Sequence, residues 1–233
     1  MKLCIIPARG GSKRIPRKNI NDFLGKPMIA YSIEAALESG CFDRVIVSTD
    51  DIEIAQIAAK FGAEVPFMRP KELANDQADT LSVIKHAIEW VELQENEVKE
   101  VCCLYATAPF VQGDSIKLAY EQLKETNADY CFTVTSFSFP IQRAFKVTKQ
   151  KRIEMFYPSH LNTRSQDLEE AYHDAGQFYW GKADAFKQLK PLFSEYASPF
   201  VLPRYLVQDI DTSEDWLRAE MMYRVLQKTG LFE

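Results

Sequence analysis

The chain has 233 residues, of which 46% are hydrophobic and 26% charged, and its formal net charge is −5. This composition is typical of a globular domain, and the acidic balance argues against broad binding to nucleic acid. No apolar run has membrane-spanning length, and we expect no secretory signal, because the N-terminal segment becomes charged too early. The five cysteines form no C-x-x-C pair, so we expect neither disulfides nor a zinc site, but a reduced, cytoplasmic protein.

Strand and helix patterns alternate along the first 136 residues. The expected strands are 2–7, 43–49, 64–68, 100–106 and 128–136. The expected helices are 27–39, 52–61, 80–93 and 115–126, the second of them capped by Asp50 or Asp51. Alternation of this kind predicts an α/β fold, a Rossmann-like and mostly parallel sheet with helices on both faces.

The alternation breaks at about residues 137–175. This segment is polar, irregular and rich in aromatic residues, which is typical of an inserted arm. Strand patterns follow at 176–181 and 205–211, and a helix pattern at 213–228. No linker-like stretch divides the chain, so we expect residues 1–233 to form a single domain that carries the arm.

A dense basic loop follows the first strand. Its glycines, Gly10 and Gly11, let backbone N–H groups approach an anion. Its cations are Arg9, Lys13, Arg14, Arg17 and Lys18. Ligands of open α/β sheets bind beyond the carboxyl ends of the strands, which is where this loop lies, so a polyphosphate is the expected ligand. The loop matches neither the Walker motif nor G-x-G-x-x-G, and a solvated basic loop is the alternative.

The loop sequence IPARGGSKRIPRKN closely resembles the first motif of the CMP-sialic acid synthetase family, the cytidylyltransferases that make CMP-activated nonulosonic acids. The resemblance continues through VSTDD, ANDQADT, LYATAPF, NTRSQDLEEAYHDAGQFYWG and QDIDTSEDW. Within the family, FPIQRAF and AYHDAGQFYWG resemble the pseudaminic acid branch, whereas the sialic acid branch is expected to carry asparagine at Ala175. The resemblance implies a Rossmann-like domain with a dimerisation arm, and a reaction of CTP with a nonulosonic acid that yields the CMP-sugar and pyrophosphate.

The resemblance also implies which residues bind the nucleotide. Those of the first loop are Ala8, Arg9, Gly10, Ser12, Lys13, Lys18 and Asn19, and those farther along are Asp76, Thr107 and Ala108. Arg9 and Lys18 are expected to be catalytic, because they would neutralise charge that develops on the phosphates. Asp76 either orients the cytosine or ribose or caps the helix that starts near Thr80.

The sugar must be bound through a carboxylate and several polar groups. Arg143 and Arg164 suit the carboxylate, because a guanidinium pairs with it bidentately. The further candidates for sugar binding are Gln112, Gln166, Tyr172, Gln177, Phe178 and Tyr179. The family counterpart of the arm pairs subunits, so we expect a homodimer in which the arm of one chain completes the sugar site of the other.

The motif QDIDTSEDW predicts a metal site. On a strand, Asp209 and Asp211 would project from one face, and paired carboxylates with room for phosphate oxygens suit Mg²⁺. The resemblance implies that both are catalytic metal ligands, while Thr212 or Ser213 caps the helix that follows. Without a metal, His173 is the first candidate for a general base, although the adjacent Asp174 would point to the opposite face of the strand.

Other functions are compatible with parts of this sequence. Legionaminic or N-acetylneuraminic acid could replace pseudaminic acid as the substrate. DID at 209–211 also resembles the metal motif of sugar-nucleotide-dependent glycosyltransferases, although those enzymes do not require the basic loop. A non-catalytic nucleotide-sensing module is a third possibility, which the paired carboxylates argue against.

Overall fold

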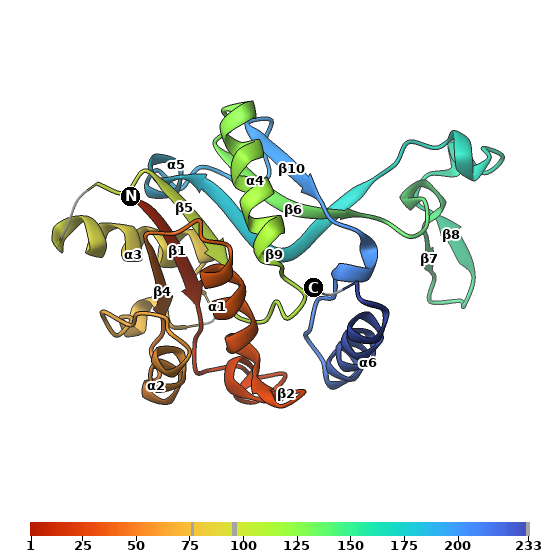
Figure 1. Ribbon diagram of the computed structural model, residues 1–233. Coiled ribbons are helices and arrows are strands. Elements are labelled where there is room, and N and C mark those ends of the chain that lie inside the picture. Colours follow the sequence, from red (N-terminus) through yellow and green to blue (C-terminus); the bar gives the residue numbers. More distant parts are fainter. Residues whose placement is uncertain (76, 95–96, 232–233) are drawn as a thin grey trace.

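A mixed six-stranded sheet forms the centre of the computed structural model, which describes residues 1–75, 77–94 and 97–231 (Figure 1). The strand order is β10-β6-β9-β5-β1-β4. The bounds are β1 Lys2–Pro7, β4 Arg44–Ser48, β5 Glu100–Leu104, β6 Tyr130–Ser136, β9 Tyr172–Lys182 and β10 Ala197–Val201. All neighbouring pairs are parallel except those of β9, which runs antiparallel to β5 and β6. The predicted mostly parallel α/β sheet is confirmed.

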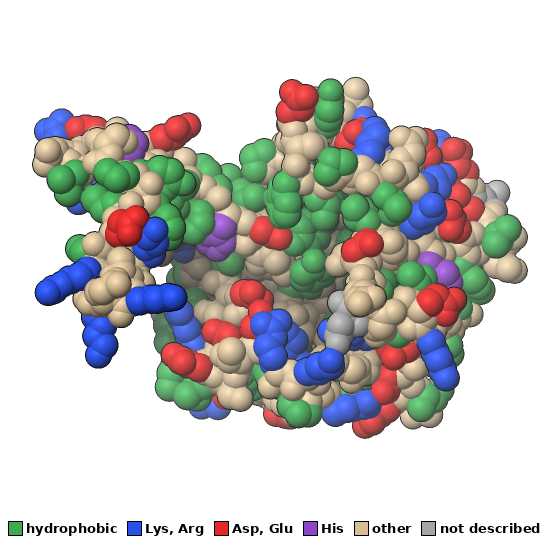
Figure 2. All heavy atoms as spheres, turned by 180° about the vertical axis from the view of Figure 1, so that it is seen from behind, with side chains coloured by type: hydrophobic (Ala, Val, Ile, Leu, Met, Phe, Trp, Pro, Cys, Tyr) green, Lys and Arg blue, Asp and Glu red, His purple; other side chains and the backbone are tan. Residues whose placement is uncertain are grey.

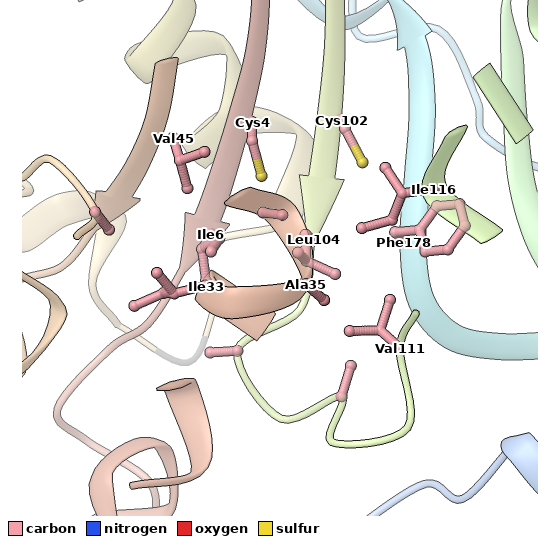
Figure 3. Packing of buried hydrophobic residues seen from close by; sticks show 14 of the residues in the cluster. Cys4, Ile6, Ile33, Ala35, Val45, Cys102, Leu104, Val111, Ile116 and Phe178 are labelled. Atoms are coloured by element: carbon pink, nitrogen blue, oxygen red, sulfur yellow. The ribbon is translucent and has the colours of Figure 1, made fainter. Parts of the chain in front are cut away.

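Helices cover both faces of this sheet. They are α1 Met28–Glu38, α2 Ile52–Lys60, α3 Thr80–Gln94, α4 Gly113–Thr126, α5 Ala183–Lys187 and α6 Ser213–Thr229. One buried cluster joins α1, α2 and α4 to the sheet, and a second joins α3 and α5 to the opposite face. Figure 3 shows the first cluster, where Cys4 and Cys102 point from neighbouring strands toward the helical layer. All five cysteines are free and buried, where thiols pack as small apolar groups.

A third cluster attaches α6 to the rest of the domain. The short hairpin of β2 (Asp22–Phe23) and β3 (Lys26–Pro27) places Phe23 against Trp216 and Tyr223 of α6, with ring centroids 5.5 and 5.6 Å apart. Ile210 is buried in the same cluster. Thr212 caps α6 through a reciprocal capping box with Asp215, as the serine-threonine pair predicts.

The segment 137–175 projects from the side of the sheet as an arm (Figure 1). It contains short 3₁₀ turns and one hairpin, formed by β7 (Phe145–Val147) and β8 (Ile153–Met155), while its last four residues already belong to β9. Hydrophobic side chains lie at its surface (Figure 2). The interpretation of the chain as one domain with an inserted arm stays a prediction.

Two predicted strands are wrong. Residues 64–68 make only isolated bridges, Ile46 to Glu64 and Thr49 to Met68, because Pro66 offers no N–H between them. Residues 204–206 form a 3₁₀ turn after Pro203, and 207–211 have no regular structure, so Asp209 and Asp211 do not lie on a strand. The sheet is instead completed at its edge by β10, whose Pro199 is tolerated because β10 pairs on one side only.

Within the described residues, no helix combines the length and the apolar character that crossing a membrane requires.

Candidate active site

The basic loop folds back against the end of β4. The backbone N–H of Gly10 donates to the Oδ1 atom of Asp50 at 2.9 Å. A Cβ atom on Gly10 would lie 2.6 Å from Asp51 Oδ2, so the close approach requires glycine. Asp51, and not Asp50, caps α2 by accepting from the N–H groups of Glu53 and Ile54. The VSTDD motif therefore supplies one anchor for the loop and one helix cap.

The cations of the loop are held by carboxylates from two distant segments. Arg17 pairs with Asp51 and Glu53. The hydrogen bond from Arg17 lowers the pKa of Asp51 and raises that of Arg17 itself. On the other side, Arg14 pairs with Asp211 at 2.8 Å. Arg17 therefore joins the loop to the start of α2, while Arg14 lies next to the predicted metal ligands.

Lys18 joins the loop directly to the C-terminal segment. Its Nζ donates to the carbonyl of Ile210 at 2.6 Å and lies 3.4 Å from Asp211 Oδ1. The buried Asn19 donates to the carbonyl of Arg9 at 2.9 Å, which fixes the fold of the loop. The structure thus brings together predicted catalytic residues that are more than 190 residues apart.

Asp209 and Asp211 form a carboxylate pair, although not by the strand alternation expected for them. Desolvation raises the pKa of Asp209, the charge of Asp211 raises it further, and Lys18 and Arg14 offset part of this increase. Ile210 between them is buried, which fixes the backbone of the pair. No cluster of three or more His, Cys, Asp and Glu side chains suited to a metal occurs among the described residues. A metal here would therefore need oxygen ligands from substrate or water, which suits Mg²⁺.

Two adjoining cavities lie at this edge of the sheet, and they share Pro7 and Arg9. The loop cavity, about 200 Å³, is lined by Pro7, Arg9, Ser12, Lys13, Arg14, Ile15, Lys18 and Asn19. The Tyr105 cavity, about 230 Å³, is lined by Pro7, Arg9, Arg69, Leu73, Asn75, Ala78, Thr80, Val83 and Tyr105. The first is lined by four cationic side chains, and the second combines two arginines with mostly uncharged residues, so together they suit a nucleotide with its phosphates in the first and its nucleoside in the second.

Arg69, Asn75 and Tyr105 were not among the sequence-predicted site residues. Arg69 is buried, and it donates from Nε to Ser48 Oγ at 3.1 Å and from Nη2 to the Ser48 carbonyl. Burial lowers the pKa of Arg69 to about 10, although Asp50 opposes the shift. Asn75 lies in ANDQADT and Tyr105 in LYATAPF, so the motifs pointed to the correct segments but not to these members.

The other predicted nucleotide residues have mixed positions. Ala8 and Ala108 are buried, and neither they nor the half-buried Thr107 line the two cavities. Asp76 lies outside the described residues. Asp79 caps α3, because the N–H of Ser82 donates to its Oδ1 at 2.8 Å.

Half of the predicted sugar residues lie in the exposed arm, away from the two cavities. Arg143 donates to the carbonyl of Thr163 at 2.5 Å, and Arg164 pairs with Asp167 at 2.7 Å. Gln166 and Tyr172 are exposed, and the Tyr172 hydroxyl donates to Glu170 at 2.8 Å. The arm is therefore not folded over the site of its own chain.

The remaining predicted sugar residues belong to the domain itself. Gln112 lines a separate cavity of about 370 Å³ between α1, α4 and α6. Gln177 is buried and donates to the carbonyl of Leu206 at 2.5 Å, and Phe178 is fully buried in the core. Both side chains are thus packed inside the domain, and their contact with sugar stays a prediction. Tyr179 is buried on the opposite face, where its hydroxyl donates to Asp174.

His173 is exposed at the start of β9. Its Nδ1 lies 2.8 Å from the backbone carbonyl of Asp174, and its ring contacts Phe137 edge-on with centroids 4.8 Å apart. The Asp174 carboxylate accepts from Tyr179 instead, so only the backbone carbonyl of Asp174 contacts the His173 ring.

Comparison with known proteins agrees with this geometry. A sequence model of the family described as "Cytidylyltransferase" matches residues 3–228. The chain belongs to the cytidylyltransferase family. This cytidylyltransferase is 52% identical over 223 residues to the pseudaminic acid cytidylyltransferase of Campylobacter jejuni, with 96% of each chain covered.

Two further comparisons are more distant. This cytidylyltransferase is 31% identical to CMP-N,N'-diacetyllegionaminic acid synthase of Legionella pneumophila, with 97% of each chain covered. A solved structure of CMP:2-keto-3-deoxy-manno-octonic acid synthetase complexed with CTP shares the fold at a TM-score of 0.71 and 18% identity, covering 96% of this chain and 98% of that one. The family resemblance of the motifs is confirmed, and it argues against both a glycosyltransferase and a non-catalytic module.

Lys18 gives a direct test of the basic loop. We expect Lys18→Ala and Arg9→Ala each to lower kcat/KM by a factor that corresponds to about 2–4 kcal/mol of transition-state stabilisation, because each removes a charge-assisted contact to phosphate. Pyrophosphate release from CTP measures this effect. Lys124→Ala removes an exposed ion pair with Glu100, away from the site, and serves as the control. If both loop variants had the kinetics of the wild type, the alternative interpretation, a solvated basic loop without a catalytic role, would be supported.

Proposed function

We propose that this cytidylyltransferase transfers the CMP group of CTP to the anomeric hydroxyl of pseudaminic acid and releases pyrophosphate. The observation that carries the proposal is the 52% identity, across 96% of both chains, to the pseudaminic acid cytidylyltransferase of Campylobacter jejuni. The legionaminic acid synthase, whose sugar differs in stereochemistry, shares only 31% identity. The basic loop, which meets a carboxylate pair beside the Tyr105 cavity, supports the same reaction.

The two cavities suggest how CTP lies in the site. The loop cavity offers Arg9, Lys13, Arg14 and Lys18 to a triphosphate with about four negative charges near neutral pH. Arg9 also lines the Tyr105 cavity, so it would bridge the phosphates and the nucleoside. The buried Arg69 and the exposed Asn75 then supply polar groups to the nucleoside.

The chemistry of such a transfer is mainly positioning and charge neutralisation. The sugar hydroxyl attacks the α-phosphorus, the bond to the bridging oxygen breaks, and pyrophosphate leaves in line. Arg9 and Lys18 stabilise the negative charge on the phosphate oxygens. Because Lys18 is already fixed by Ile210 and Asp211, this stabilisation requires little reorganisation when substrate binds.

Asp209 and Asp211 fit a divalent cation. Desolvation and then the charge of Asp211 raise the pKa of Asp209, and a bound cation would offset both effects. Arg14 and Lys18 partly provide that charge now, and a triphosphate would draw the exposed Arg14 toward its phosphates, which leaves Asp211 Oδ2 available. A bound Mg²⁺ would neutralise charge on the phosphates, and the chain's contribution is to hold it at this pair.

The sugar site requires a second copy of the chain. Arg143 and Arg164, the residues predicted to bind the carboxylate of the sugar, lie in the arm, and neither lines the two cavities. Its surface exposes large apolar side chains, namely Phe139, Phe145, Val147, Ile153, Phe156 and Leu161. Exposed apolar surface of this kind is typical of an interface. We therefore propose a homodimer in which each arm completes the sugar site of the other chain.

A substrate panel tests the choice of sugar. With CTP fixed, we expect the highest kcat/KM with pseudaminic acid and low values with legionaminic and N-acetylneuraminic acids, because a site built to bind one set of polar groups leaves them unpaired with another. Comparable values for all three would refute the sugar assignment and leave the reaction class intact.

Metal removal tests the carboxylate pair. We expect EDTA to abolish activity, Mg²⁺ to restore it, and Asp209→Ala and Asp211→Ala to be folded but nearly inactive. Metal binding requires ionised carboxylates and the pKa of Asp209 is raised, so Mg²⁺ affinity should fall with decreasing pH earlier than at an ordinary aspartate. Glu214→Gln, a neighbouring exposed carboxylate, is the control. Full activity in chelator would direct the search to a protein base, beginning with His173.

Mixed dimers test the arm. Lys18→Ala disables the nucleotide side and Arg164→Ala the arm, so each homodimer should be inactive. If arms are exchanged, a mixed dimer has one intact site, and random mixing should restore roughly a quarter of the activity. Light scattering reports the dimer itself. No recovery on mixing, or a fully active monomer, contradicts the proposal.

A further inference from the structure

The basic loop turns at Arg17, whose backbone lies in the left-handed region with a φ of 58° and a ψ of 26°. The N–H of Lys18 donates to the carbonyl of Ile15 at 3.2 Å, which closes a four-residue turn with Pro16 second and Arg17 third. A turn with proline in second place and a positive φ in third favours glycine or asparagine at the third position. Because arginine carries a Cβ atom, this conformation should be about 5–30-fold less populated with arginine than with glycine.

Two carboxylates at the start of α2 hold the side chain of Arg17. Its Nη1 donates to Asp51 Oδ2, and its Nη2 donates to Asp51 Oδ1 at 3.2 Å and to Glu53 Oε2. Asp51 is itself fixed, because its Oδ1 accepts from the N–H groups of Glu53 and Ile54 at 2.9 and 3.0 Å. Isolated surface ion pairs contribute little, but a bidentate arginine pair within a network contributes more. These contacts therefore offset the backbone cost at residue 17.

The side chain of Arg17 differs in direction from the other cations of the loop. Arg9, Lys13, Arg14 and Lys18 line the loop cavity, whereas Arg17 lines neither this cavity nor the Tyr105 cavity. Its guanidinium is paired with the carboxylates of α2 instead. The geometry thus gives Arg17 a role in the shape of the loop and not in direct contact with phosphate.

The turn at Arg17 determines where Lys18 lies. The 3₁₀ turn Lys18–Ile20 begins directly after Arg17, and the N–H of Ile20 donates to the Arg17 carbonyl at 3.0 Å. From this turn, Lys18 Nζ reaches the carbonyl of Ile210 at 2.6 Å. A change of the φ of Arg17 to the ordinary negative range would redirect the chain that follows and withdraw Lys18 from this position.

We propose that Arg17 is a positioning residue, which its ion pairs with Asp51 and Glu53 keep in the left-handed conformation so that Lys18 faces the phosphates. The inference rests on the proposed function, in which Lys18 stabilises negative charge on the phosphate oxygens. It gives the VSTDD segment a further task, because Asp51 connects the N-terminus of α2 to the placement of a catalytic side chain.

Replacement of Arg17 by alanine and by glycine separates the backbone from the charge. Both variants lose the guanidinium, but only alanine keeps a Cβ atom that opposes the left-handed conformation. We expect Arg17→Ala to lower kcat/KM about 5–30-fold and Arg17→Gly to stay close to the wild type, because glycine adopts a positive φ readily. A loss in Arg17→Gly as large as that in Arg17→Ala would show that the guanidinium itself acts on phosphate. That result, or wild-type kinetics in both variants, overturns the proposal.

A double variant tests whether Arg17 acts through Lys18. If it does, Arg17→Ala should cause no further loss of kcat/KM once Lys18→Ala has removed the amine, because residues that act as a unit are not additive. Pyrophosphate release from CTP measures all three proteins. If the two losses multiply instead, Arg17 acts independently of Lys18 and the proposal is wrong.

Asp51→Asn tests the carboxylate side with almost no change in shape. The amide oxygen continues to cap α2, so the amide NH₂ faces the guanidinium of Arg17, where two donors meet. We expect kcat/KM to fall toward that of Arg17→Ala, and we expect the same change to have no effect in Arg17→Gly. No effect in the wild type, or a loss in the glycine variant, would contradict the proposal.

Arg44→Ala is the matched control. It removes an arginine pair with the Glu64 carboxylate at the first residue of β4, whereas the basic loop lies at the other end of this strand. Both Arg44→Ala and Arg17→Ala lose a bidentate ion pair, so both can lower the melting temperature. Only Arg17→Ala should lower kcat/KM, which separates positioning from stability.

The choice of sugar does not affect this test, because pyrophosphate release can be measured with whichever nonulosonic acid the wild type accepts. Absence of sugar-dependent release with every nonulosonic acid would refute the proposed function. Calorimetric binding of CTP would then still test the turn, because it needs no turnover. Weaker binding by Arg17→Ala than by Arg17→Gly would support the inference, and equal binding by both would refute it.

Discussion

The geometry of this site depends on holding like charges close together. Arg14, Arg17 and Lys18 lie within five residues of one another, where their mutual repulsion opposes a fixed conformation. The protein supplies carboxylates from two distant segments, around Asp51 on one side and Asp211 on the other. Because these partners are fixed by a helix cap and a buried isoleucine, the cations are preorganised for an anionic ligand.

The need to hold Asp211 beside the basic loop explains why α6 packs against the segment that follows this loop. Phe23 contacts Trp216 and Tyr223 edge-on, and Tyr31 packs on Tyr223 with centroids 5.3 Å apart, so α6 is fixed to the segment that follows the basic loop. The residues just before α6 are consequently placed beside Lys18. The aromatic cluster thus sets the distance between the loop and the carboxylate pair. Loosening this cluster would weaken the ion pairs of the loop with Asp211 before it affected the sheet.

The sequence predicted the helices and strands that have a clear hydrophobic pattern of their own. It failed for segments whose structure depends on whether another strand pairs with them. The buried strands β1, β4, β5 and β6 and the long helices have periodic patterns that do not depend on their neighbours. In contrast, 205–211 alternates like a strand but follows Pro203 and pairs with no strand among the described residues. β10 contains Pro199 and forms as an edge strand beside β6. The motifs identified the basic loop. They did not predict its ion pair with Asp211, because no local sequence pattern relates two residues so far apart in the chain.

Asp174 and Tyr179 show the same limit within a single strand. Side chains five positions apart point to opposite faces of a regular strand, so alternation predicts that these two cannot meet. They meet because β9 advances five residues, from Asp174 to Tyr179, while the facing β6 moves only two, between Val134 and Phe132. The positive φ at Gly176 takes up the difference. A bulge therefore divides a contiguous motif into two parts, one that continues into the arm and one that packs in the sheet, and it lets the Tyr179 hydroxyl donate to Asp174.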